Sequence, residues 1–337
     1  MTRHEGRAQG GDGNPPSATT RGTGAKPIVY VARALPGDAF ARLRELTDLR
    51  GGDPTPRPRE EQIALAADAV VYVPTYLDPV DAALLEALPL LRLVASYGVG
   101  TDHIDLAACR ARGVVITNTP GVLTEATADL TFALLLAAAR RVAEGDRFVR
   151  AGLWTSIDPT QFLGCDVHGR MLGLIGFGRI GQAVARRAYG FGMKVIYASP
   201  RTVDFPGLRR LPLEELLAAA DFVSIHCPLT EETRGLLSKE RLALMKPGAV
   251  LVNTARGAIV DETALADALA SGHLRAAGID VFTAEPSVSP VLRAQPHVVL
   301  TPHIGSGSTE ARLAMSQIVA DEIRRFVAGE HLRHRVV

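Results

Sequence analysis

The chain has 337 residues, of which 47% are hydrophobic and 22% charged, and its formal net charge is +1. These values are ordinary for a globular protein, and the length predicts two domains and a sizeable core. The near-neutral charge creates no field that would draw nucleic acid or an anionic membrane to the surface, so it argues against partners of both kinds. A small molecule is the expected partner.

The start of the chain, its apolar stretches and its cysteines all indicate a cytoplasmic protein. Residues 1–26 contain almost no large apolar side chain and lack the apolar segment of a secretion signal, so they are predicted to be a disordered tail. The longest apolar stretch, "LTFALLLAAA", ends at two arginines after about half of the ~20 residues that a membrane span requires. Cys109, Cys165 and Cys227 are few and show no metal-ligand spacing, which favours a reducing compartment and predicts no metal site.

From Pro27 onward, short apolar runs alternate with segments of helical composition. A first series of predicted strands covers residues 28–32, 69–73, 91–96 and 114–117. A second, longer series covers residues 171–176, 194–198, 222–226, 249–253, 276–280 and 298–301. This alternation is the βαβ rhythm of a parallel sheet, so the sequence predicts an α/β protein with two doubly wound, Rossmann-like domains.

Two longer helices are expected where the two series meet. One covers residues 124–142, and the other begins near Ser306 and carries an apolar stripe before Gly329 ends it. The stripe consists of Met315, Val319, Ile323 and Phe326. Because this last helix is too short to found a domain, we expect it to pack back onto the first unit. The prediction is a substrate-binding domain of residues 27–119 and 303–337, with a dinucleotide-binding domain of residues 120–302 inserted in it.

A glycine-rich turn follows the first strand of the second series. In "GLIGFGRIG" the glycines Gly176, Gly178 and Gly181 have the spacing that turns a strand sharply into a helix. In that setting the backbone N–H groups at the helix N-terminus hold a pyrophosphate. The turn therefore predicts dinucleotide binding, since it has both the preceding strand and the following helix that the motif requires.

Four further stretches occur in a fixed order: "GVGTDHID" at 98–105, "NTARGAIVDE" at 253–262, "GIDVFTAEP" at 278–286 and "TPHIGS" at 301–306. With them the chain, from Pro27 to its end, resembles the D-isomer-specific 2-hydroxyacid dehydrogenases. The stretch "GLWTSIDPTQFLGCDVHGRMLGLIGFGRIG" is most similar to the glyoxylate and hydroxypyruvate reductases of that family. The resemblance implies hydride transfer between a nicotinamide cofactor and a small 2-oxo or 2-hydroxy acid.

Carried over to this chain, the resemblance makes Arg256 the residue that orients the substrate, His303 the proton donor and acceptor, and Glu285 its carboxylate partner. These residue types suit the reaction, because the carbonyl oxygen of a 2-oxo acid must gain a proton when its carbon gains a hydride. A neighbouring carboxylate favours the charged form of a histidine. An arginine can hold the substrate carboxylate in a fork, which the point charge of lysine does less well.

The resemblance also implies further substrate contacts. The "GVG" loop, with Val99 and Gly100, is similar to the family's substrate-carboxylate loop, in which backbone N–H groups form an anion nest. Trp154, the only tryptophan, lies in a loop that in related reductases reaches toward the partner's active site, and a locally packed tryptophan is the alternative. A homodimer formed through the nucleotide domains is expected.

The expected cofactor contacts lie around the glycine turn and after the strands of the second series. They are Gly176, Gly178, Arg179, Ile180, Gly181, Ser199, Arg201, Cys227, Pro228, Thr233, Thr254, Ala255, Asp280, His303 and Gly305. The strand "KVIYA" is not followed by the acid that usually binds the ribose of NAD, and Ser199 stands in its place. Without that acid to repel a 2′-phosphate, the sequence predicts a preference for NADPH, with NADH also possible.

Two departures from the family pattern are visible. The segment between Glu285 and His303 lacks the usual "DHPL" sequence, and the chain has Ser199-Pro200-Arg201 where relatives that use a phosphorylated cofactor often have Ser-Arg. Other activities remain open, among them D-3-phosphoglycerate dehydrogenase or another D-2-hydroxyacid dehydrogenase. A non-enzymatic NAD(H) sensor similar to the related corepressors is the alternative from another class.

Overall fold

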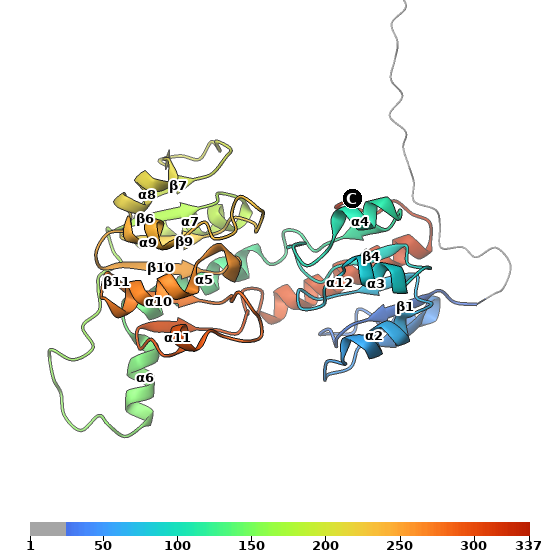
Figure 1. Ribbon diagram of the computed structural model, residues 1–337, viewed down its shortest axis with the longest axis horizontal. Helices are drawn as coiled ribbons and strands as arrows, with labels where there is room; N and C mark the ends of the chain where they lie inside the picture. Colours follow the sequence, from blue (N-terminus) through green and yellow to red (C-terminus); the bar gives the residue numbers. More distant parts are fainter. Residues whose placement is uncertain (1–24) are drawn as a thin grey trace, which may run out of the picture. The chain divides into compact units, whose positions relative to one another are not determined.

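The computed structural model describes residues 25–337, which form two compact units (Figure 1). One unit extends to Pro120 and resumes at Leu313–Val337, and the other is Gly121–Arg312. The tail predicted over residues 1–26 lies, except for Ala25 and Lys26, outside the described residues. Among residues 25–337, none of the helices has both the length and the apolar character that crossing a membrane would require.

The first unit is built on a parallel sheet of five strands in the order β2-β1-β3-β4-β5. Its strands are β1 (Ile28–Val31), β2 (Asp48–Gly51), β3 (Val71–Val73), β4 (Leu93–Ala95) and β5 (Val115–Thr117). Its helices are α1 (Leu43–Leu46), α2 (Arg59–Ala66), α3 (Ala82–Ala87), α4 (Leu106–Ala111) and most of α12 (Thr309–Val327). Val319, Ile323 and Phe326 of the apolar stripe on α12 are buried in one cluster with residues of β1, β3 and β4.

The second unit is built on a parallel sheet of seven strands in the order β12-β11-β10-β9-β6-β7-β8. Its strands are β6 (Met171–Ile175), β7 (Lys194–Ala198), β8 (Arg209–Arg210), β9 (Phe222–Ile225), β10 (Ala249–Asn253), β11 (Leu274–Ile279) and β12 (Val298–Leu300). Its α-helices are α5 (Thr124–Ala139), α6 (Val142–Arg150), α7 (Arg179–Gly190), α8 (Leu213–Ala219), α9 (Lys239–Ala243), α10 (Glu262–Ala270) and α11 (Pro290–Arg293), and a short 3-10 helix covers Gly257–Ile259. The predicted α/β class with two parallel-sheet domains is confirmed.

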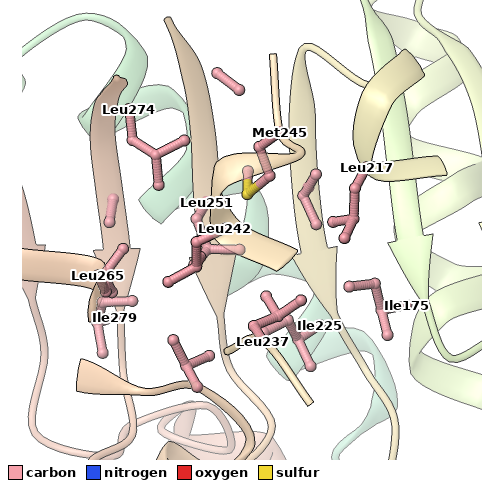
Figure 2. Packing of buried hydrophobic residues seen from close by; sticks show 14 of the residues in the cluster. Ile175, Leu217, Ile225, Leu237, Leu242, Met245, Leu251, Leu265, Leu274 and Ile279 are labelled. Carbon is pink, nitrogen blue, oxygen red and sulfur yellow. The ribbon is translucent and has the colours of Figure 1, made fainter. Parts of the chain in front are cut away.

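The central strands of this second sheet are apolar along their whole length because helices cover both faces. All of β10 is buried, for example. On one face the core contains residues of α8, α9 and α10, among them Leu217, Leu242 and Leu265, in one cluster with Leu251 of β10 (Figure 2). On the other face the core contains residues of α5 and α7. This two-sided burial holds the carboxyl ends of the strands in fixed positions.

The structure contains two strands that the sequence did not predict, and it divides one predicted helix into two. The strands β2 and β8 are edge strands with the sequences "DLRG" and "RR", so they lack the apolar run by which a strand is recognised. The helix expected over residues 124–142 ends at Ala139, and α6 starts at Val142 after Arg141 adopts a φ of 56°. The chain returns to the end of α5 at Gly164 and Cys165. There the Cys165 N–H donates to the Ala139 carbonyl, which in a longer helix would accept from an N–H group of the next turn.

The second boundary between the units lies after Arg312 and not after residue 302. The reason is the way the segment after β12 is held. The N–H of His303 donates to the Asp280 carbonyl, and the N–H groups of Ile304 and Gly305 donate to the Asp280 carboxylate. These bonds keep the segment on the seven-stranded sheet before α12 returns to the first unit.

Candidate active site

The three glycines in the turn from β6 into α7 differ in what a side chain at each position would meet. Gly176 has a φ of 91°, and a Cβ there would collide with the backbone of His226 and Cys227. A Cβ on Gly181 would lie 2.6 Å from the Gly176 carbonyl oxygen. A Cβ on Gly178 would meet nothing within 4 Å. The first and third glycines therefore make the turn, while the second leaves open space before the helix.

The open position at Gly178 leaves the start of α7 accessible to a phosphate group. Gly178 is the residue before α7, and Arg179 and Ile180 are its first residues. The first N–H groups of a helix have no partner within it, and they carry the positive end of the helix dipole. A pyrophosphate held there would need the backbone to be bare at Gly178.

The other residues expected at the cofactor follow the carboxyl ends of β9, β10 and β12. After β9, the Thr233 hydroxyl donates to the Pro228 carbonyl at 2.7 Å, which closes the loop on itself. Burial raises the pKa of the Cys227 thiol to about 11, so the thiol is protonated at neutral pH.

After β10, the Thr254 hydroxyl lies 3.0 Å from the hydroxyl of Thr131 on α5, and Ala255 follows Thr254 in the chain. Gly305, after β12, is buried.

The loop after β7 is braced by an arginine that the sequence did not single out. Arg210 of β8 donates from Nε to the Ser199 carbonyl at 2.8 Å and from Nη2 to the Pro200 carbonyl at 3.2 Å. Its Nη1 donates to the Thr202 hydroxyl at 3.2 Å. Ser199 is half-buried and Arg201 is exposed. No sequence signal identifies Arg210, because its strand is only two residues long.

Arg256 follows β10 in a turn shaped by a buried amide. The Asn253 side chain, 1% exposed, donates to the Arg256 carbonyl at 2.9 Å and accepts from the Ala255 N–H at 3.0 Å. Gly257 comes next, and a Cβ there would collide with the backbone of Phe282. The turn after β10 therefore packs directly on the segment after β11. Asn253 could have been found from the sequence, since it is a polar residue that ends an otherwise apolar strand.

Glu285 and His303 form a short pair across the ends of β11 and β12. The Nδ1 atom of His303 lies 2.7 Å from Oε2 of Glu285, and the side chains are 19% and 14% exposed. The other carboxylate oxygen, Oε1, accepts from the Phe282 N–H at 2.9 Å. With Nδ1 turned to the carboxylate, Nε2 is the ring nitrogen that can exchange a proton with a bound molecule.

The Asp280 carboxylate holds the loop that carries His303. It accepts from the Thr301 hydroxyl at 2.7 Å and from the N–H groups of Ile304 and Gly305, each at 2.8 Å. His303 itself has a φ of 52°, which is rare for a residue with a side chain. Burial raises the pKa of Asp280, and the three donors and His303 oppose that rise. Asp280 is therefore a buried carboxylate that fixes the conformation of the loop through hydrogen bonds.

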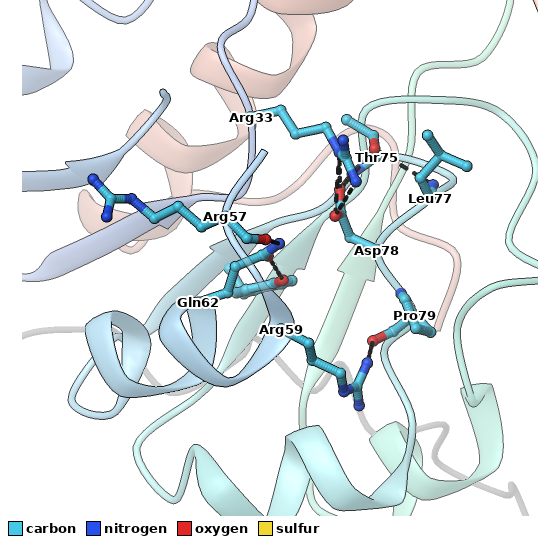
Figure 3. Close-up of polar contacts among 9 residues, drawn as sticks. Arg33, Arg57, Arg59, Gln62, Thr75, Leu77, Asp78 and Pro79 are labelled. Carbon is cyan, nitrogen blue, oxygen red and sulfur yellow. Dashed lines mark hydrogen bonds and ion pairs between the residues drawn. The ribbon is translucent and has the colours of Figure 1, made fainter. Parts of the chain in front are cut away.

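Val99 and Gly100 belong to the first unit, in the loop after β4. Val99 is 37% exposed, and within residues 25–337 the N–H groups of Val99 and Gly100 donate no hydrogen bond. The neighbouring loop after β3 is rigid, because the Asp78 carboxylate accepts from Arg33 and from Thr75 (Figure 3). A loop with two available N–H groups can bind an anion.

The amino-acid sequence matches known dehydrogenases over most of its length. Residues 132–305 match the family described as "D-isomer specific 2-hydroxyacid dehydrogenase, NAD binding domain". The glyoxylate reductase of Korarchaeum cryptofilum is 48% identical over 313 residues, which cover 90% of this chain and 94% of that protein. The chain belongs to the D-isomer specific 2-hydroxyacid dehydrogenases.

Solved structures of similar proteins agree with this family. The TT0316 protein of Thermus thermophilus is 48% identical with a TM-score of 0.88, over 92% of this chain and all of that one (100%). An NADPH-dependent glyoxylate/hydroxypyruvate reductase of Sinorhizobium meliloti, solved with NADP and malonate, is 32% identical with a TM-score of 0.83, over 93% and 97% of the two chains. This dehydrogenase is thus an NAD(P)-dependent enzyme, and its relatives do not favour the sensor or the phosphoglycerate alternative.

In this dehydrogenase Trp154 lies in the segment after α6 and is 62% exposed. The segment of residues 142–163, which we call the arm, also exposes Val142, Val149, Leu153, Ile157 and Leu163. In Figure 1, α6 and the loop after it stand away from the seven-stranded sheet. The ring of Phe162 packs on Phe148 and lies under the Arg141 guanidinium, so the two ends of the arm are held together.

The glycine turn of the dehydrogenase generates a prediction that needs no enzyme assay. Gly178→Ala should unfold in urea at the wild-type midpoint, since its Cβ meets nothing, but should bind NADPH about tenfold or more weakly because the methyl group occupies the pyrophosphate space. Gly181→Ala is the comparison: its Cβ would press on the Gly176 carbonyl, so stability should fall by ~1–3 kcal/mol. Wild-type NADPH affinity in Gly178→Ala would rule out this turn as the pyrophosphate site.

Proposed function

We propose that the enzyme reduces glyoxylate and hydroxypyruvate to the corresponding 2-hydroxy acids. The observation that carries the proposal is the Glu285–His303 pair, 2.7 Å apart, at the same sheet edge as the glycine turn and the Arg256 turn. Further support comes from the relatives named glyoxylate reductase and from the structurally similar glyoxylate/hydroxypyruvate reductase. When bound, the nicotinamide cofactor supplies the hydride for the carbonyl carbon.

His303 is the proposed proton donor to the carbonyl oxygen. The imidazole can donate from Nε2 while Nδ1 stays bonded to Glu285. The carboxylate fixes the orientation of the ring and stabilises its positive charge before the proton leaves. Glu285 is itself anchored by the Phe282 N–H, so the carboxylate that holds the ring is fixed in position. In the direction of oxidation the same nitrogen accepts the proton.

Arg256 and the loop of Val99 and Gly100 are the proposed ligands of the substrate. The guanidinium can pair with a carboxylate and polarise the carbonyl next to it, and the two N–H groups supply an anion nest. The Arg256 turn is anchored by the buried Asn253 amide, which limits how far the guanidinium can move. Holding the substrate carboxylate at fixed groups reduces the freedom that would otherwise be lost when the carbonyl reacts.

A preference for NADPH is proposed from the loop after β7. Ser199 follows the strand where an acid would repel the 2′-phosphate, whose charge at neutral pH is about −1.5 to −2. Arg201 is exposed beside it, and Arg210 braces the loop with three hydrogen bonds. These cations favour a phosphate, and one charge-assisted hydrogen bond contributes ~1.5–3 kcal/mol.

A cytoplasmic homodimer is the proposed form of the enzyme. The arm exposes six large apolar side chains in one segment, including Ile157 at 85% and Leu163 at 63%. Apolar side chains gathered in this way mark a protein interface, and a second copy of the chain is the occupant we propose. All three cysteines are free thiols, which is consistent with a reducing compartment.

The proton donor is tested by His303→Gln, which keeps the size and polarity of the side chain but cannot donate an acidic proton. The kcat for glyoxylate should fall by roughly 10²–10⁴-fold, while the dissociation constant for NADPH changes little. His168→Gln, at an exposed histidine three residues before β6, is the control and should retain wild-type kcat. A wild-type kcat in His303→Gln would remove His303 from the reaction.

Trp154→Ala tests whether the arm reaches a neighbouring active site. The variant should fold normally, because the side chain is 62% exposed, and the ratio of kcat/KM for hydroxypyruvate and glyoxylate should shift by roughly tenfold, the effect of ~1.4 kcal/mol. Leu244→Ala, an exposed leucine outside the arm, is the control. If Trp154→Ala is a dimer by light scattering and its ratio of kcat/KM for the two substrates is unchanged, Trp154 is a local packing residue.

The cofactor preference is tested by steady-state kinetics with NADPH and NADH. Ser199→Asp should erase or reverse the preference for NADPH because it restores the repulsive charge, and Arg201→Ala should weaken NADPH roughly ten- to a hundredfold while sparing NADH. Arg209→Ala is the control on β8, since alternate residues of a strand face opposite sides. A higher kcat/KM with NADH in the unmodified enzyme would contradict the proposal.

A further inference from the structure

The first unit contains a buried carboxylate that the proposed reaction does not use. Glu322, on α12, is 1% exposed. Its two carboxylate oxygens accept from the Arg333 N–H at 3.2 and 3.1 Å, and Oε1 lies 3.1 Å from Nδ1 of His334. A buried carboxylate is costly unless it is hydrogen-bonded, and here both oxygens are bonded to the end of the chain. Glu322 thus fastens the last residues to α12.

The fastened residues lie along the edge of the five-stranded sheet. β5 is the last strand in the sheet order, and Arg335 forms an antiparallel bridge with Thr117 on it. The Val336 N–H donates to the Ile116 carbonyl at 2.7 Å, and the Asn118 N–H donates to the His334 carbonyl at 3.2 Å. Residues 333–337, which we call the C-terminal clasp, therefore hold both β5 and the residue that follows it.

The segment after β5 in turn holds the loop of Val99 and Gly100. The Asn118 side-chain amide donates to the Val99 carbonyl at 2.9 Å, and the Thr119 N–H donates to the Gly98 carbonyl at 2.9 Å. In a trans peptide, the carbonyl of one residue and the N–H of the next point in opposite directions in one rigid plane. Fixing the Gly98 and Val99 carbonyls therefore aims the N–H groups of Val99 and Gly100 away from residues 118–119.

We infer that Asn118 is a positioning residue for the substrate carboxylate and that Glu322, through the C-terminal clasp, holds Asn118 in place. The inference rests on the proposed function, in which the N–H groups of Val99 and Gly100 bind that carboxylate. An anion nest binds only while its N–H groups point together, since each misaligned group loses its hydrogen bond. Asn118 supplies this alignment without touching the substrate.

The test compares Asn118→Ala and Glu322→Gln with the unmodified enzyme. In Asn118→Ala the KM for glyoxylate should rise roughly three- to tenfold, the effect of one net hydrogen bond, while kcat and the NADPH dissociation constant stay within about twofold. Glu322→Gln keeps the size of the side chain but loses its charge, so it should also raise the KM for glyoxylate, by a smaller factor than Asn118→Ala. Arg335→Ala is the matched control, because Arg335 joins the clasp through its backbone.

Amide hydrogen exchange of the peptide covering residues 116–121 gives a second readout that needs no turnover, because its Thr119 N–H donates to the Gly98 carbonyl and is protected only while the loop stays attached. Exchange should be faster in Asn118→Ala and Glu322→Gln than in the unmodified enzyme and in Arg335→Ala. Unchanged exchange, or faster exchange with an unchanged KM, would overturn the inference. An unmodified enzyme that reduces no 2-oxo acid would defeat the proposed function instead, and in that case the exchange rates alone decide whether Asn118 and Glu322 order this loop.

Discussion

At the carboxyl end of β11, the Asp280 carboxylate accepts hydrogen bonds from Thr301, Ile304 and Gly305 while the whole residue is buried. The segment after β12 is thereby folded back over the end of β11, and His303 is held at a φ of 52°. A left-handed residue with a side chain costs of order 1–3 kcal/mol unless its surroundings fix it. The pairing of His303 with Glu285 depends on this backbone, because Glu285 approaches from the loop after β11.

The same device recurs at the ends of other strands. Asn253 ends the apolar β10 and bonds to the turn of Arg256, and Asn118 follows β5 and bonds to the carbonyl of Val99. In each case apolar strands buried on both faces provide a rigid base, and one polar side chain at the strand end shapes the loop beyond it. The loops at the strand ends can therefore carry different functional residues while the two parallel sheets below them are built in the same way.

Much of the fold could be predicted because its signals are local. The ten apolar strands, the glycine turn and the stripe on α12 are visible as runs or spacings along the chain. The edge strands β2 and β8 could not be found, since their stability comes from pairing with β1 and β7 and not from apolar side chains of their own. The break at Arg141 was also invisible, because the group that ends α5 is the Cys165 N–H, which returns from a distant part of the chain.

For the site, the sequence by itself determined the residue types and their order: the three glycines of the turn, then Arg256, Glu285 and His303, each after a strand of one parallel sheet. Only the tertiary structure decided which atoms meet. Three contacts are examples: Nδ1 of His303 with Glu285, Arg210 with the loop after β7, and the C-terminal clasp with β5. Each joins two segments of the chain, and no motif or regular spacing in the sequence indicates that the two segments meet. Hydrogen bonds act over about 3 Å and depend on direction, so they are set by the packed backbone and not by spacing in the sequence.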